Sequence, residues 1–285
     1  SMPKPTRLFR SVLYIPGSKE RALEKAQGLA ADAIIFDLED AVAPDEKLRA
    51  RAVLAQALQA DYGPRARIVR INGFETDWGR ADAATFADHP GVDAVLIPKV
   101  STPADVDAVV ALVPGKPLWA MMETALGMLN AGALAAHPAV QGMVMGTNDL
   151  AKELGSRLRA DRLPMMAGLG LCVLAAKAHD RVIVDGVYNA FKDDAGLRAE
   201  CEQGRDMGFD GKTLIHPAQL ESANAAFAPR EAEIDLARRQ IAAFDDAMAQ
   251  GQAVAVVDGR IVETLHIITA RAILARADAI AALSV

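Results

Sequence analysis

Short apolar runs recur from residue 12 to about residue 217 and alternate with alanine-rich stretches that have helical spacing. This alternation is typical of βα units built around a parallel sheet. The runs cover residues 12–15, 33–36, 66–69, 94–97, 118–122, 142–145, 182–184 and 213–215. Because eight such strands close a TIM barrel, we predict an α/β fold organised as a (β/α)8 barrel.

Helical patterns lie between these runs. Residues 19–30, 127–136 and 200–207 carry apolar positions at helical spacing. A further helix is predicted over 102–113, where Thr102 is the N-cap and Pro103 occupies the first helical position. The segment between the sixth and seventh runs is long, and we expect an insertion around 157–164.

The pattern changes after Pro217. Residues 229–249 predict one long charged helix, 251–261 contain a hairpin-like segment, and 267–283 predict a last helix. We therefore predict a catalytic barrel domain over residues 3–224. Residues 225–285 would form a C-terminal helical extension that packs on its own barrel or on a neighbouring one.

Composition excludes several classes of protein. The chain has 285 residues, of which 52% are hydrophobic, 5% aromatic and 24% charged, as in a globular protein built from small aliphatic side chains. Its net charge of −6 argues against a nucleic-acid or membrane partner. The two cysteines cannot form a disulfide framework, and the five histidines lack zinc-site spacing. Since neither a membrane-spanning run nor an apolar leader is seen, we expect a cytoplasmic protein.

Polar residues follow the predicted strands, at the ends where TIM barrels carry their active sites. They are Asp37, Glu39, Asp40, Arg70, Asn72, Lys99, Glu123, Asn148, Asp149, Asp185 and His216. Carboxylates that converge without histidine or cysteine suit a hard divalent cation, above all Mg2+. Arg70 offers a planar fork for a substrate carboxylate. The pattern predicts a site for an oxo-acid or hydroxy-acid.

Other chemistries have less support. The motifs of P-loop NTPases, dinucleotide-binding folds and serine hydrolases are missing from the sequence. Lys99 ends a strand and could form a Schiff base, but beside a metal site we expect it to contact a phosphate or carboxylate. Asp37, Glu39 and Asp40 can either orient the metal and substrate ligands or serve as structural hydrogen-bonding groups.

A series of motifs, in order along nearly the whole chain, resembles the citrate lyase β-subunit-like branch of the HpcH/HpaI aldolase family. The motifs are F-R-S-V-L-Y-I-P-G-S (9–18), D-L-E-D-A-V (37–42), V-R-I-N (69–72), I-P-K-V (97–100), M-E-T-A (122–125), G-T-N-D-L (146–150), D-G-V-Y (185–188) and G-F-D-G-K-T-L-I-H-P (208–217). The malyl-CoA and citramalyl-CoA lyases belong to this branch.

The resemblance implies the roles of several residues. Glu123 and Asp149 match the ligands of Mg2+, for which Mn2+ can substitute, and Arg70 matches the arginine that binds the substrate carboxylate. Arg10 matches a second arginine near the oxo-acid and the CoA thioester. The backbone amides of Asn148 and Asp149 would help to hold the oxo-acid, although relatives often carry a small or acidic residue in place of Asn148.

The resemblance also implies a homo-oligomer, a trimer or hexamer, with active sites shared between subunits. Relatives place an aspartate in the C-terminal segment and donate it to the neighbouring site. The equivalent residue here is Glu263, which we expect to act as the acid–base residue from one methylene further away.

The expected activity is that of a Mg2+-dependent carbon–carbon lyase. It would cleave or form a 3-hydroxyacyl-CoA thioester such as malyl-CoA, β-methylmalyl-CoA or citramalyl-CoA, giving an acyl-CoA and an oxo-acid. Three alternatives stay open on the sequence: a malyl-CoA thioesterase, a carrier-protein-dependent subunit of a citrate lyase-like complex, and a free-acid pyruvate aldolase.

Overall fold

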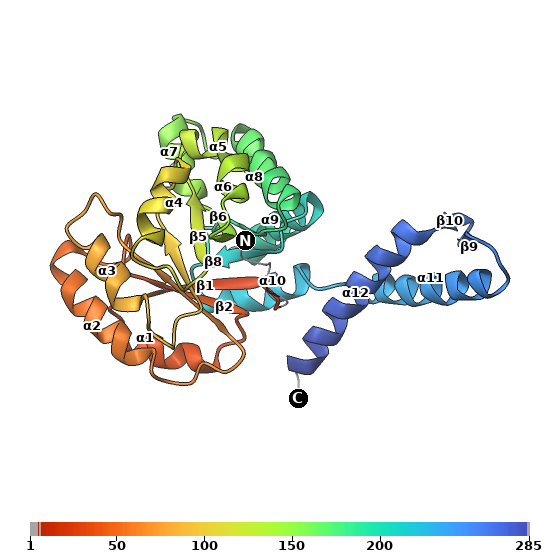
Figure 1. Ribbon diagram of the computed structural model, residues 1–285, viewed down its shortest axis with the longest axis horizontal. Coiled ribbons are helices and arrows are strands. Elements are labelled where there is room, and N and C mark those ends of the chain that lie inside the picture. Colours follow the sequence, from red (N-terminus) through yellow and green to blue (C-terminus); the bar gives the residue numbers. More distant parts are fainter. Residues whose placement is uncertain (1–4, 6, 284–285) are drawn as a thin grey trace. The chain divides into compact units, whose positions relative to one another are not determined.

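Eight parallel strands close into a barrel in which each strand pairs with its neighbours in the sequence and β1 pairs with β8 (Figure 1). The computed structural model describes residue 5 and residues 7–283. The barrel strands are β1 (Ser11–Pro16), β2 (Ala33–Asp37), β3 (Ala66–Arg70), β4 (Ala94–Ile97), β5 (Leu118–Met122), β6 (Val140–Met145), β7 (Val182–Asp185) and β8 (Gly211–Leu214). Each corresponds to one predicted apolar run, and the TIM-barrel prediction is confirmed.

Helices follow the strands and surround the barrel (Figure 1). They are α1 (Glu20–Lys25), α2 (Lys47–Ala57), α3 (Gly79–Phe86), α4 (Pro103–Val110), α5 (Ala125–Leu129), α6 (Ala131–Ala136), α7 (Thr147–Leu154), α8 (Met166–Ala178), α9 (Asp194–Met207) and α10 (Leu220–Ala226). Short 3₁₀ helices are η1 (Ala26–Gly28), η2 (Pro44–Glu46), η3 (Leu163–Met165) and η4 (Pro217–Gln219).

The four helices predicted between the runs differ in detail, and α9 begins at Asp194, six residues before the helix predicted over 200–207. The helix predicted over 19–30 tightens into η1 after Lys25, as the last turn of a helix commonly does. The helix predicted over 127–136 is divided into α5 and α6 at Asn130. Helix α4 is shorter than predicted, but it begins after Thr102 as expected, and the Asp105 carboxylate accepts the Thr102 amide at 2.9 Å.

Alternation along the strands creates two apolar layers. One layer fills the barrel and includes Val12, Ile35, Ile68 and Met121. The intervening residues belong to the layer between the strands and the helices. Because side chains alternate with a period of two, the inward-facing series continues to the strand ends and places polar side chains at the mouth. This alternation positions the site described below.

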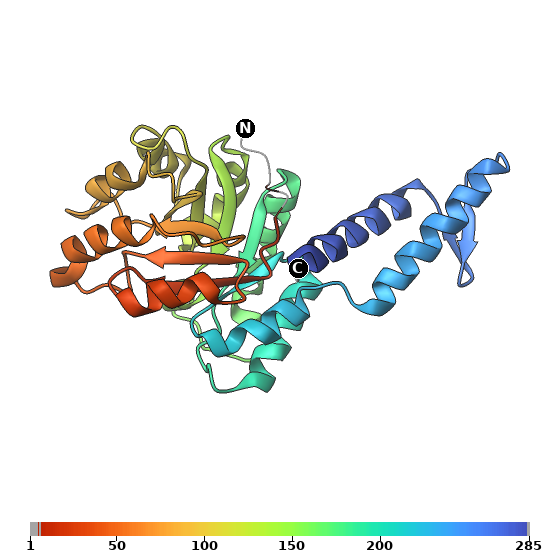
Figure 2. The same ribbon diagram turned by 90° about the horizontal axis from the view of Figure 1, so that it is seen from below.

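The residues that follow the barrel form a second unit. The chain divides into two compact units, one ending at Phe227 and one beginning at Ala228. The second unit contains α11 (Glu231–Ala249), the antiparallel strands β9 (Ala255–Val257) and β10 (Arg260–Val262), and α12 (Thr264–Leu283) (Figures 1 and 2).

Its helices α11 and α12 pack against each other around a small core of Phe244, Val262 and Ile267. The predicted helical extension and hairpin are thus confirmed. Both residues of the hairpin turn, Asp258 and Gly259, have positive φ, as the favoured two-residue turn requires. The surface on which this unit packs stays a prediction. Residues 3, 4, 6, 284 and 285 of the predicted domains lie outside the described residues.

None of the described helices is both long enough and apolar enough to cross a lipid bilayer.

Candidate active site

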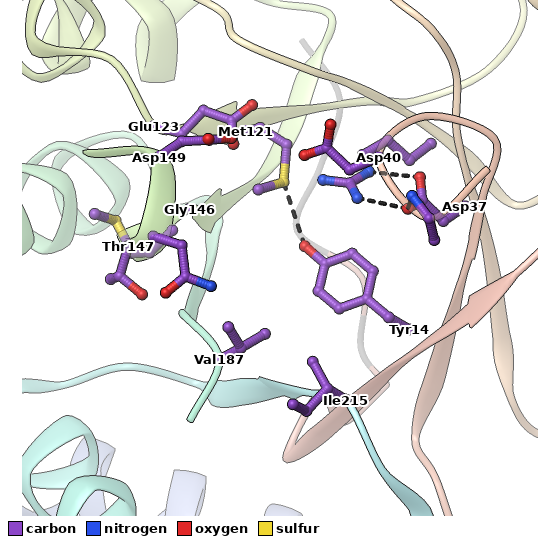
Figure 3. A pocket seen from close by; sticks show the side chains of 14 residues that line it. Tyr14, Asp37, Asp40, Met121, Glu123, Gly146, Thr147, Asp149, Val187 and Ile215 are labelled. Atoms are coloured by element: carbon purple, nitrogen blue, oxygen red, sulfur yellow. Dashed lines mark hydrogen bonds and ion pairs between the residues drawn. The ribbon is translucent and has the colours of Figure 1, made fainter. Parts of the chain in front are cut away.

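A cavity of about 300 Å³ lies at the C-terminal ends of the barrel strands (Figure 3). Tyr14 of β1, Asp37 of β2 and Arg70 of β3 line it together with Glu123, which follows β5, and Asp149 of α7. Four of these side chains continue the inward-facing series of their strands, and Asp149 lies in the first turn of a helix that follows β6 directly. The strand ends therefore bring together most of the residues that the sequence singled out.

Arg70 and Asp37 form a buried, bidentate pair. The register between β2 and β3 places the two residues side by side. The Arg70 Nε donates to Asp37 Oδ1 at 2.7 Å, and Nη2 donates to Oδ2 at 2.6 Å. Burial alone would raise the pKa of Asp37, but the charge and hydrogen bonds of Arg70 lower it below its ordinary value overall. Asp37 is therefore an anion that holds the arginine in place.

This pair changes what Arg70 can offer a ligand. The sequence analysis expected the Arg70 guanidinium to be free to bind a substrate carboxylate through two parallel hydrogen bonds. In the structure, the Nε and Nη2 edge of the guanidinium already binds Asp37. The Nη1 atom lies 3.5 Å from Glu39 Oε1. A substrate carboxylate can meet the outer edge of the guanidinium, formed by Nη1 and the second Nη2 proton, but not the fork.

Lys99 is tied to two acidic residues of the site. Its Nζ donates to Glu39 Oε2 at 2.6 Å, and its amide donates to Glu123 Oε1 at 2.8 Å. Lys99 has a φ of 51°, a left-handed conformation that is unusual for a side chain of this size and aims the amide at Glu123.

The charge state of Lys99 argues against Schiff-base chemistry. Partial burial lowers the pKa of the Lys99 ammonium, but its hydrogen bond and attraction to Glu39 raise it overall. A Schiff-base lysine must be neutral, so these contacts favour a structural role. Glu39 is nearly buried, and its burial raises the pKa of its carboxyl even though Arg70 and Lys99 oppose the shift.

Glu123 and Asp149 lie side by side, with their carboxyl groups close enough to interact (Figure 3). Burial, together with the Asp149 carboxyl, raises the pKa of Glu123 to about 8, against the opposing effects of the Lys99 amide and Arg70. Burial and the neighbouring Asp149 therefore disfavour a charged Glu123, an effect that a bound cation would oppose.

The donor set fits Mg2+. Among the described residues, no group of three or more His, Cys, Asp or Glu side chains forms a metal cluster. Mg2+ is commonly held by one or two carboxylates, with water and substrate oxygens completing its octahedron. A pair of carboxylates that open into a cavity matches that pattern.

Asn148 and Asp149 lie in the first turn of α7, whose amides have no partner within the helix. The Asn148 side chain exchanges hydrogen bonds with Asn189 at 3.1 and 2.9 Å. The Asn148 side chain thus holds the loop that contains Asn189. The first residues of α7 line the same cavity as the two carboxylates of Glu123 and Asp149, called the acidic pair below. Amides in the first turn of a helix favour an anionic ligand.

Tyr14 is a cavity residue that the sequence analysis did not single out. Its ring lies against the Arg70 guanidinium, 5.0 Å from ring centroid to Cζ, and its hydroxyl contacts the Met121 thioether at 3.6 Å. Burial raises the pKa of the hydroxyl, so it stays a neutral donor. The sequence could have indicated Tyr14, because side chains alternate along a strand and Val12, two residues earlier, faces the barrel interior.

Arg10, Glu39 and Glu263 are predicted site residues that are not among those lining this cavity. Arg10 precedes β1 and so lies at the opposite end of the strand from the mouth, where its Nε and Nη2 bind Asp32 at 2.9 and 2.8 Å. Glu263 belongs to the second unit, between β10 and α12, where its amide donates to His266 Nδ1 at 3.1 Å. Arg10 thus contacts Asp32 and is not among the residues that line the cavity.

A model of the HpcH/HpaI aldolase/citrate lyase family matches residues 10–217. The chain belongs to this family. Its fold is similar to that of protein CitE from Mycobacterium tuberculosis, solved in complex with magnesium, acetoacetate and coenzyme A, with a TM-score of 0.81 and 28% identity. That similarity covers 96% of this chain and all of the other. A protein of similar fold has therefore been solved with both magnesium and coenzyme A bound.

Two kinds of curated relatives match the chain over nearly its full length. A (3S)-malyl-CoA thioesterase from Cereibacter sphaeroides is 74% identical over 96% of both chains. An L-malyl-CoA/β-methylmalyl-CoA lyase from the same organism is 35% identical over 98% of this chain and 97% of its own.

The lyase activity expected from the sequence is wrong on this comparison. Four thioesterases are 72 to 74% identical to the chain, whereas the lyases are 33 to 35% identical. The motifs that carried the lyase interpretation mark strand ends that hold the acidic pair and Arg70. They locate these side chains at the cavity and did not indicate whether a carbon–carbon bond or a thioester bond would be broken.

Proposed function

We propose that the chain is a thioesterase that hydrolyses a 3-hydroxyacyl-CoA, (3S)-malyl-CoA in the first place, to malate and free CoA. The observation that carries this proposal is the 74% identity to (3S)-malyl-CoA thioesterase over 96% of both chains. The cavity supports it, because an acidic pair, an arginine edge and helix amides are suited to a hydroxy-acid with a free carboxylate.

Glu123 and Asp149 would hold Mg2+, or Mn2+ in its place. Their proximity and the raised pKa of Glu123 support this assignment, since a cation relieves the repulsion between the two carboxylates. When bound, the metal supplies a Lewis acid that can chelate the hydroxyl and carboxylate of the malyl group. CoA enters as part of the substrate.

This chain's own residues would orient the substrate. The outer edge of Arg70, kept in place by Asp37, and the amides of Asn148 and Asp149 would bind the malyl carboxylate. The Tyr14 hydroxyl offers a neutral donor for the thioester carbonyl oxygen, on which negative charge develops during hydrolysis.

We also propose that Glu263 acts across a subunit boundary as an acid–base residue, for example to protonate the leaving sulfur. It is exposed, and it precedes a helix whose Leu265 and Ile268 are 67% and 63% exposed. Apolar side chains that exposed are expected to be covered in an assembly. A homo-oligomer, a trimer or hexamer, would place Glu263 near the cavity of a neighbour.

A panel of CoA esters with Mg2+ tests the proposal, with free thiol and glyoxylate measured separately. Malyl-CoA should release thiol in stoichiometry with malate and without glyoxylate. Release of glyoxylate and acetyl-CoA, or inactivity on every free CoA ester, would contradict the thioesterase assignment. Full activity in excess EDTA would contradict the metal site alone.

A further inference from the structure

Hydrolysis of a thioester needs a group that takes a proton from the attacking water, and the cavity offers four carboxylates. Three of them are engaged. Asp37 accepts two hydrogen bonds from Arg70 and two from backbone amides. Glu123 and Asp149 lie side by side and make up the proposed cation site. The fourth carboxylate is Asp40.

Asp40 differs from the other three in having no direct partner. Across residue 5 and residues 7–283, its carboxylate makes no hydrogen bond and no ion pair. It is exposed to solvent and lines the cavity at the same time. In Figure 3 its side chain points toward the side of the cavity where Met121 and the Glu123–Asp149 pair lie. Water can therefore reach its oxygens from the solvent.

The backbone that carries Asp40 is held on both sides. The Asp37 carboxylate accepts hydrogen bonds from the Glu39 amide at 2.9 Å and from the Ala41 amide at 3.0 Å. These bonds hold the residues directly before and after Asp40. The buried Lys47 ammonium donates to the carbonyl oxygens of Leu38 and Glu39 at 3.0 and 2.8 Å. A catalytic group needs such a fixed backbone, because small displacements from the reactive geometry are costly.

We propose that Asp40 is the general base of hydrolysis, an inference that rests on the thioesterase function proposed above. Asp40 accepts a proton from water as the water oxygen forms a bond to the thioester carbonyl carbon. The carbon–sulfur bond then breaks, the sulfur leaves with the bonding electron pair and is protonated, and the acyl group departs as a carboxylate. Water and thioester thus give acid and thiol, with no oxidation or reduction.

Hydrolysis adds one requirement to a site that binds the acyl group and a cation, namely a base that water can reach. Asp40 meets that requirement without disturbing a buried pair, because its own contacts are with solvent.

D40N and the matched control D45N test the assignment on the full-length protein with Mg2+ and malyl-CoA. Asp45 is an exposed aspartate of the same segment that does not line the cavity. D40N should lower kcat for thiol release by at least 100-fold, with KM within threefold of wild type, because general-base catalysis contributes typically about 10² to 10⁴-fold. D45N should match wild type.

Chemical rescue separates a base from a structural residue. D40A should regain activity with sodium formate but not with sodium chloride at equal ionic strength, since formate supplies the missing carboxylate. A D40N enzyme within threefold of wild type in kcat would overturn the inference, as would loss of activity that formate does not restore in D40A. A wild-type protein that releases no thiol would overturn the proposed function and this role with it.

Discussion

Arg70 lies at the barrel mouth with 8% of its side chain exposed, and its position depends on the charge of Asp37. A guanidinium taken out of water is costly unless its charge and hydrogen bonds are matched. The bidentate bond to Asp37 and the contact to Glu39 provide that match. The same bonds fix which edge of the arginine a ligand can meet, so the residue serves stability and binding together.

Arg70→Lys should therefore damage both properties. A single ammonium cannot reproduce two parallel bonds to Asp37 and still face the cavity. We expect the free energy of unfolding to fall by about 3 kcal/mol, as when a buried pair is broken, and thiol release to fall at least 100-fold. Chemical denaturation and steady-state kinetics measure the two effects. Near-normal kinetics would assign Arg70 to charge balance alone.

Tyr14→Phe removes one hydroxyl and keeps the ring that lies against Arg70. If the hydroxyl donates to the developing oxyanion, kcat should fall about 10²-fold while KM and the unfolding midpoint change little. Trp119→Phe, which changes an aromatic side chain inside the barrel but outside the cavity, controls for packing in the barrel interior. An unchanged kcat for Tyr14→Phe would remove the hydroxyl from the mechanism.

At the scale of elements, apolar runs were sufficient to predict all eight barrel strands, and the residues after them gave the acidic pair and Arg70. The contacts between these side chains were harder to predict. The Arg70–Asp37 pair depends on the register between β2 and β3, and the hydrogen bond from the Lys99 amide to Glu123 depends on the positive φ of Lys99. Arg10 was assigned to the site from the motif resemblance, although its position before β1 places it at the opposite end of that strand from the mouth.

The junction of β6 and α7 brings Gly146 against Glu123. A Cβ on Gly146 would lie 2.5 Å from both Glu123 Cβ and Oε2, closer than atoms in contact can approach. Gly146→Ala should therefore displace Glu123 and weaken Mg2+ binding at least tenfold while the barrel still folds. Isothermal titration with Mg2+ measures this.

Gly132→Ala is the matched control for that substitution. No atom lies within 4 Å of the added Cβ at this position in α6, where alanine favours the helix by up to about 1 kcal/mol. Its Mg2+ affinity should equal that of wild type. Equal affinities for both variants would show that Gly146 does not set the position of a metal ligand.

At the scale of the whole molecule, the second unit buries few side chains of its own and carries Glu263. Sequence could predict this unit from the change of pattern after Pro217. It could not predict hydrolysis, because the motifs that carried the family resemblance did not distinguish a thioesterase from a lyase. Asp40, our candidate for the base, lies within the D-L-E-D-A-V motif that carried the resemblance, so its presence in the sequence could not indicate hydrolysis.

Mixing two inactive variants tests whether sites are shared between subunits. Glu123→Ala removes a proposed metal ligand, and Glu263→Ala removes the residue expected to come from a neighbour. After subunit exchange, mixed oligomers should regain part of the wild-type thiol release, since some sites combine an intact cavity with an intact Glu263. No recovery after demonstrated exchange, or a fully active Glu263→Ala protein, would contradict sharing.

Hydrolysis in water enriched in ¹⁸O tests the central claim most directly. The protein with Mg2+ and malyl-CoA should give malate that carries one ¹⁸O in the carboxyl group formed from the thioester, together with free CoA. Mass spectrometry of the malate locates the label. Formation of glyoxylate and acetyl-CoA, or malate without ¹⁸O in that carboxyl group, would contradict the account.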